Sequence, residues 1–161
     1  LREQVDLQVS TIAELKATDL ARWRTERLGN GRVLQESRAF RRLADGLLAG
    51  TLPSDDEAVL GQWLGSVRES YGYASVELLD AGGTRRLSIP TDAPPIVGDD
   101  GRHFAELLRS GEARLVDFHT HEPGGMLRMA VVVPVVLEGR PRGAGFGADC
   151  KTSGAPKAVT R

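Results

Sequence analysis

The spacing of the apolar residues changes from a helical to a strand pattern at Gly72. Before this glycine, apolar side chains recur at i, i+3, i+4 and i+7, the spacing of an amphipathic helix. The residues of this stripe are Leu60, Trp63, Leu64, Val67 and Tyr71. After it, short apolar runs alternate with glycine-rich turns, which is typical of strands joined as hairpins. Helices that precede strands in this way favour an α+β fold with an antiparallel sheet.

Two helices are expected before this stripe. The first thirty residues contain no proline, and their apolar residues follow an approximate 3-4 spacing. The sequence Gly29-Asn30-Gly31 then predicts a break or a sharp bend. A second helix follows and ends at Gly50, with one side formed by Val33, Phe40, Leu43, Ala44 and Leu47.

The third helix opens at Pro53-Ser54, and its start carries two favourable signals. Ser54 and Glu57 have the spacing of a capping box. Asp55, Asp56 and Glu57 lie where the helix dipole favours negative charge. The helix is predicted to end at Gly72.

Five strands and one short helix are expected in the second half. Residues 91–101 predict a loop, and Asp99 or Asp100 caps a helix that is stopped by Gly111. The apolar residues of that helix are Phe104, Leu107 and Leu108. The expected strands are Tyr73–Asp80, Arg85–Pro90, Ala113–His121, Met126–Glu138 and a fifth that begins near Arg142.

Length and charge restrict the class of protein. A chain of 161 residues predicts one domain, and the net charge of −1 gives no electrostatic case for a nucleic-acid partner. The single cysteine, Cys150, excludes an intrachain disulfide. The longest apolar run, Met129–Leu137, is about half the length of a membrane span. Because the chain begins at Leu1, we expect a fragment whose membrane anchor lies outside it.

Three segments, in this order, carry a family resemblance. They are "TIAELKATDLARWRTERLGNGRVLQESRAF", "YGYASVELLDAGGTRRLS" and "LLRSGEARLVDFHTHEPGGMLRMAVVVPVV". From Val5 to Ala148 the chain resembles the extracytoplasmic PAS-like sensor domains, of the single Cache or PDC type, of bacterial transmembrane receptors. The glycine-rich sequence from Gly143 onward departs from the last strand of that family.

The resemblance implies a long N-terminal helix and further helices packed on a five-stranded antiparallel PAS-like sheet, over residues 1–148, followed by a tail over 149–161. It implies a small ligand between the sheet and the loop-helix segment that covers it. It also implies a periplasmic location, a homodimer formed through the N-terminal helix, and flanking transmembrane helices outside this fragment. The domain itself is expected to be non-enzymatic and to hold no cofactor, while the full-length receptor ends in an output such as a histidine kinase or a diguanylate cyclase.

Polar residues on or beside the predicted strands are the candidate ligand contacts. A pocket needs a few oriented polar groups among apolar ones. The mixture of arginine and carboxylate suits an amino acid or a carboxylate metabolite. The candidates are Tyr73, Glu77, Arg86, Asp117, His119 and Arg128.

A second hypothesis concerns the histidines near the end of the third strand. His119 and His121 are two positions apart, so on a strand both point to one side and reach the same ion. Asp117 and Glu122 would complete the set of three or four ligands that zinc requires, in a metal sensor or a metal-dependent enzyme. A polar strand end beside a turn explains the same residues. A third hypothesis, a cytoplasmic PAS or GAF regulatory module, predicts no apolar span of about 20 residues upstream of Leu1.

Overall fold

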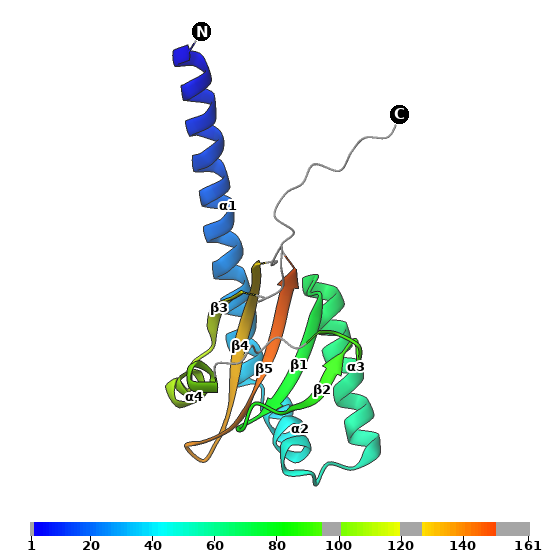
Figure 1. Cartoon of the computed structure of the whole chain (residues 1–161). Helices are drawn as coiled ribbons and strands as arrows, with labels where there is room; N and C mark the ends of the chain where they lie inside the picture. Colours follow the sequence, from blue (N-terminus) through cyan, green and yellow to red (C-terminus); the bar gives the residue numbers. More distant parts are fainter. Residues whose placement is uncertain (1, 95–100, 120–126, 151–161) are drawn as a thin grey trace, which may run out of the picture.

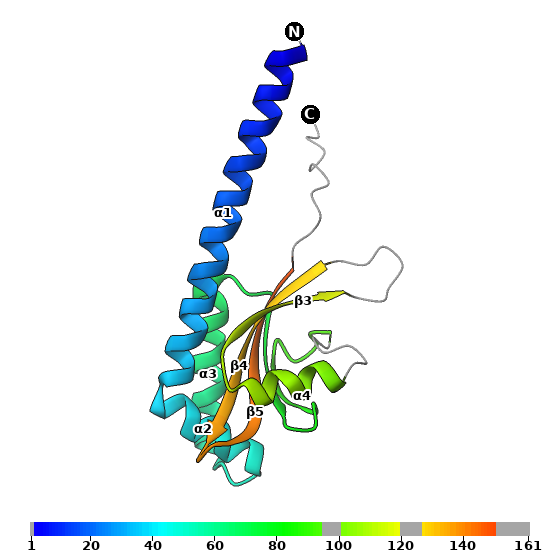
Figure 2. The same cartoon turned by 90° about the vertical axis from the view of Figure 1, so that its left-hand side faces the viewer.

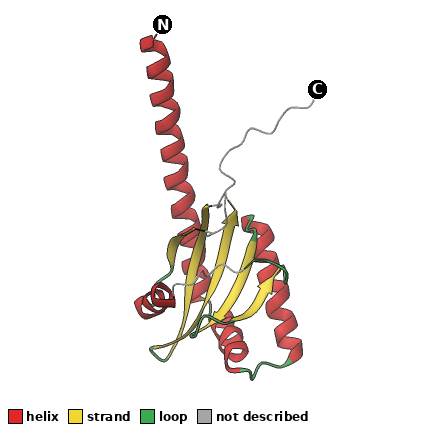
Figure 3. Cartoon of the chain, in the orientation of Figure 1, coloured by secondary structure: helices red, strands yellow, loops and turns green. Residues whose placement is uncertain are grey.

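The computed structural model describes residues 2–94, 101–119 and 127–150. Within them, helices precede strands as expected (Figure 1, Figure 3). The helices are α1 (Arg2–Glu36), α2 (Arg38–Ala49), α3 (Ser54–Tyr71) and α4 (Gly101–Ser110). The strands are β1 (Ser75–Asp80), β2 (Arg85–Ile89), β3 (Arg114–His119), β4 (Leu127–Leu137) and β5 (Arg140–Cys150).

The five strands form one sheet in the order β2-β1-β5-β4-β3, and every neighbouring pair is antiparallel. The predicted α+β class with a five-stranded antiparallel sheet is therefore confirmed. The glycine-rich β5 is the middle strand, because it pairs with β1 on one side and with β4 on the other. This strand continues to Cys150, slightly past the expected domain boundary at residue 148.

Helices cover both faces of the sheet. Helices α1, α2 and α3 pack on one face, and α4 packs against β4 and β5 on the other (Figure 2). We call these the α1 face and the α4 face. Val131 and Val133 of β4 belong to the cluster on the α1 face, whereas Ala130 and Val132 belong to the cluster on the α4 face. The near-continuous apolar run of β4 is thus explained by burial on both sides.

Helix α1 runs without interruption through Gly29-Asn30-Gly31, so the predicted break at this position is wrong. Gly31 is buried against β4, and a Cβ added to it would lie 2.7 Å from Cγ1 of Val131. The glycine therefore serves close helix–sheet packing rather than a turn. The true break is at Ser37, whose hydroxyl caps α2 by accepting a hydrogen bond from Phe40 N. Val33 consequently belongs to α1 and is 71% exposed, instead of sharing the buried side of the second helix.

Gln35 anchors the end of α1 to the sheet. Its Nε2 donates hydrogen bonds to the carbonyl oxygens of Gly111 (2.8 Å) and Pro134 (3.2 Å). Its Oε1 accepts one from Ala113 N at 3.3 Å. One side chain thus connects α1 to β4 and to the segment that joins α4 to β3.

The start of α3 differs from the expected capping box. Ser54 is the first residue of the helix, and Pro53 occupies the N-cap position without a side-chain hydrogen bond. The proline carbonyl accepts the first regular hydrogen bond of the helix, from Glu57 N at 2.9 Å. The expected glycine stop is correct, because Gly72 adopts φ +67° at the C-cap.

The N-terminal half of α1 extends beyond the sheet (Figure 1). Its large apolar side chains are exposed: Val5, Leu7, Val9, Ile12, Leu15 and Leu20. Among the described residues, no helix is both long enough and apolar enough to cross a membrane.

Two glycines of α1 test the close packing of this helix on β4. Gly29→Ala should raise the free energy of unfolding by about 1 kcal/mol, because a Cβ there meets nothing within 4 Å and alanine favours helix. Gly31→Ala should lower it by about 1–3 kcal/mol, because the methyl group overlaps Val131. Urea denaturation of both variants measures the difference. Equal effects of the two substitutions would show that α1 does not rest on β4 in this way.

Candidate functional site

The α4 face carries a buried carboxylate in a floor of small side chains. Glu77 lies in β1 and is 1% exposed. Its cross-strand partners are Ser88 on β2 and Phe146 on β5. Other small buried residues nearby are Ser75 of β1 and Ala148, which pairs with Ser75. A carboxylate among small side chains is the kind of surface on which a small polar ligand binds.

One partner of this carboxylate is Arg85. Its Nη1 lies 3.4 Å from Oε1 of Glu77 and also donates to the carbonyl oxygen of Ala93. A strong charge-assisted hydrogen bond is about 2.7–2.9 Å long, so this ion pair is loose. The arginine side chain is 33% exposed. The pair therefore links β1 to the loop after β2 and reaches towards solvent.

Helix α4 supplies the apolar cover of this face. Phe104 and Leu108 are buried against the sheet, and the ring centroids of Phe104 and Phe146 are 5.8 Å apart. The residues Ala130, Ala144 and Ala148 present only methyl groups beneath this cover. The sheet presents short side chains to α4, and the helix covers them with an aromatic ring. The polar contacts of Glu77 and Arg85 therefore lie at the β1–β2 side of the face, outside this apolar part.

The structure separates the candidate residues of β1 and β2. Tyr73 is buried on the α1 face, opposite to the carboxylate of Glu77. Arg86, which is 39% exposed, lies near Asp80, with 3.7 Å between Nη1 and Oδ2. Glu77 and Arg85 therefore form the polar pair of the α4 face, and Tyr73 and Arg86 lie outside it.

The remaining candidates lie on β3, on β4 and beyond them. In the backbone register Asp117 pairs with Met129, His119 with Leu127, and Arg128 with Phe118. His121 and Glu122 of the metal hypothesis lie outside the described residues. Within the described part of the chain, no three His, Cys, Asp or Glu residues are grouped closely enough to hold a metal ion.

Arg85 was missed because of a bulge. Strict alternation from Ser88, which faces the same side as Glu77, assigns Arg86 to that side. The register between β1 and β2 shifts between Leu78 and Leu79, and Arg85 becomes the partner of Leu79. The turn sequence Ala81-Gly82-Gly83 was the only signal for such an irregularity, and it does not specify where the extra residue falls.

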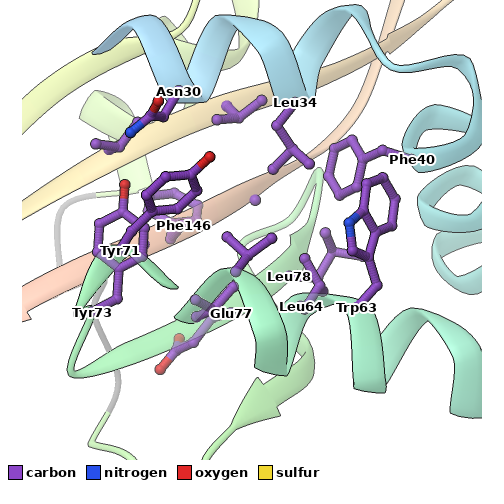
Figure 4. A pocket seen from close by; sticks show the side chains of 17 residues that line it. Asn30, Leu34, Phe40, Trp63, Leu64, Tyr71, Tyr73, Glu77, Leu78 and Phe146 are labelled. Carbon is purple, nitrogen blue, oxygen red and sulfur yellow. The ribbon is translucent and has the colours of Figure 1, made fainter. Parts of the chain in front are cut away.

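The α1 face contains a cavity of about 140 Å³ between α1, α3 and the sheet (Figure 4). Leu34 lies on its α1 side, and Leu64 and Trp63 lie on its α3 side. Asn30 and the two tyrosines, Tyr71 and Tyr73, are together at one end. Phe40 and Trp63 close the other end, with ring centroids 5.9 Å apart.

No family model and no curated protein matches the sequence, whereas solved structures match the fold. The sensor domain of the V. cholerae histidine kinase DctB is 16% identical, with 89% of this chain and 57% of that chain covered and a TM-score of 0.53. The ligand-binding domain of the Pseudomonas aeruginosa amino acid chemoreceptor PctC, in complex with GABA, is 25% identical, with 89% and 60% covered and a TM-score of 0.56. That of the Pseudomonas fluorescens chemoreceptor CtaA, in complex with L-serine, is 16% identical, with 92% and 60% covered and a TM-score of 0.53.

These likenesses confirm the expected PAS-like fold, which is that of sensor domains of histidine kinases and chemoreceptors. The chain spans 57–60% of the length of these three structures.

The buried ion pair predicts unequal effects of two neighbouring substitutions. Arg85→Met should lower the free energy of unfolding by about 1–3 kcal/mol, because it removes a charged partner from a buried carboxylate and keeps most of the aliphatic stem. Arg86→Met, at the exposed pair with Asp80, should change it by less than about 0.5 kcal/mol. Denaturant titration of both variants gives the two values. A larger loss from Arg86→Met would contradict the assignment of Arg85 to Glu77.

Proposed function

We propose that this chain is the extracytoplasmic ligand-sensing domain of a bacterial membrane signal-transduction receptor, with a sensor histidine kinase as its output. The observation that carries this proposal is the carboxylate of Glu77, which is buried in β1 on the face of the sheet that α4 covers. The fold is shared with domains described as sensor or ligand-binding domains. The domain would bind and release its ligand unchanged, and any catalysis would belong to other parts of the receptor.

The ligand we propose is a small amino acid or a related carboxylate. Glu77 would accept hydrogen bonds from the ammonium group, and Arg85 would bind the carboxylate at the exposed edge. Two proteins of the same fold support this class, since GABA and L-serine each carry both groups. Of the other candidates, Asp117, His119 and Arg128 stay predicted contacts. Tyr73 and Arg86 are not part of the proposed site.

Signalling would proceed through α1. A ligand shifts the balance between two arrangements only by its preference for one of them. Gln35 couples the position of α4 to that of α1, because its hydrogen bonds join α1 to Gly111 and Ala113 after the end of α4. A ligand that draws α4 towards the sheet would therefore pull on the end of α1 and displace this helix slightly.

We propose that the sensor domain occupies residues 1–148 and that residues 149–161 lead out of it. The receptors of the same fold have longer sensor regions than this chain. Transmembrane helices flanking the fragment would complete the receptor and place the domain in the periplasm.

We also propose a homodimer formed through α1. The exposed side chains Val5, Val9 and Ile12 follow a 4-3 spacing, which is that of a helix–helix seam. They lie in the half of the helix that extends beyond the sheet (Figure 2). Pairing of two copies would remove these side chains from water.

A thermal-shift screen of amino acids and small carboxylates tests the proposed function. A ligand at 100 times its Kd should stabilise the wild-type domain by about 2.7 kcal/mol, because it binds only the folded state. Glu77→Gln should abolish the response to the amino acid that binds, since the charge that attracts its ammonium group is lost. Asp80→Asn, which removes an acid of the same strand outside the site, should leave the response unchanged. A response that survives Glu77→Gln would contradict the assignment of the site.

Sedimentation of the domain over a concentration series tests the dimer. The wild type should associate, and Ile12→Asp should keep it monomeric because a charge in an apolar seam is costly. Ser10→Asp adds the same charge away from the stripe of Val5, Val9 and Ile12 and should associate as the wild type does. Identical behaviour of Ile12→Asp and the wild type would exclude this seam.

A further inference from the structure

The cavity on the α1 face has the size and lining of a site for a small aromatic molecule. Its volume is about 140 Å³. A cavity of about 150 Å³ lined by leucine, isoleucine and phenylalanine stays dry and binds benzene. Here the apolar lining includes Leu34, Phe40, Trp63, Leu64 and Val67. Phe40 and Trp63 meet edge to face, with an interplanar angle of 75°, and so offer ring surfaces to a third ring.

One end of the cavity is polar and adjoins the surface. Asn30 of α1 and Tyr71 of α3 line both the cavity and a surface groove between these helices. Both residues are partly exposed. In Figure 4 they lie together at the end opposite to Phe40 and Trp63. A ligand entering from the groove would therefore pass Asn30 and Tyr71 and place its ring between Phe40 and Leu64.

The sheet leaves this space open because β5 presents glycines to it. Gly145 and Gly147 line the cavity, and neither carries a side chain. A Cβ added at Gly145 would make ordinary contacts, at 3.5 Å from Phe40 and 3.7 Å from Leu78. A Cβ at Gly147 would lie only 2.9 Å from the ring of Tyr73. A methyl group therefore fits at Gly145 in ordinary contact, whereas one at Gly147 would overlap the ring of Tyr73.

We propose that this cavity is a second binding site, which takes a monocyclic aromatic molecule with one hydrogen-bonding group. The ring would lie among the apolar side chains, and the polar group would lie at the Asn30–Tyr71 end. Glu77 also lines this cavity, but its carboxylate points away from it, so the site does not depend on the ligand proposed for that carboxylate (Figure 4). Because α1 forms one wall, an occupant would contact α1, α3 and the sheet together and hold the helix in its present position.

Thermal unfolding of the domain with phenol and with toluene tests this site. Both probes should raise the Tm of the wild type in a saturable manner, because each binds only the folded state. Val67→Phe places a ring in the cavity and should abolish both shifts. Val59→Phe makes the same change on the same helix at a position that is 53% exposed, and should leave both shifts intact.

Two further variants keep the test decisive if Val67→Phe does not fold. Gly145→Ala fills part of the space without overlap and should weaken the binding of both probes. Tyr71→Phe should weaken the binding of phenol and leave that of toluene unchanged. The proposal is overturned if the wild type responds to neither probe, or if the shifts persist unchanged in Val67→Phe and Gly145→Ala. Binding of toluene with no binding of phenol would contradict the polar end of the site.

Discussion

The structure depends on a sheet whose central strands are buried on both faces. Strand β4 alternates Val131 and Val133 towards α1 with Ala130 and Val132 towards α4. Neither face is exposed to solvent, because each face is covered by its own helices. The glycines of β5 make this possible, because they let the α1 layer approach closely where Tyr73 packs and leave space where Gly145 lies. The two sites described above follow from the different side chains of these two faces.

The local structure was predictable where one signal determined it. The stripe of α3, the glycine after it and the turn between β1 and β2 are local patterns, and the structure reproduces them. The continuity of α1 was not predictable, because Gly31 is required by contact with Val131, one hundred residues further along the chain. The central place of β5 was missed for the same reason, since strand order is determined by long-range pairing.

The candidate site was predictable in part. Glu77 was selected as a polar residue on a strand, and the structure shows that it is buried on the face covered by α4. Tyr73 is on the other face, which the sequence did not reveal because it precedes β1 at the end of a turn. Arg86 was predicted instead of Arg85, because a single bulge shifts the alternation of side chains along β2 by one residue. Bulges of this kind change which side chain faces a site, and they often lie next to binding sites.

We propose above all that a small molecule binds on the α4 face and alters how α1 is held. Hydrogen–deuterium exchange with and without a ligand found by the screen measures this directly. We expect slower exchange in β1, β2 and α4, together with a change at the end of α1 around Gln35. Protection confined to α1 and α3, with the amides of β1, β2 and α4 unchanged, would contradict the claim.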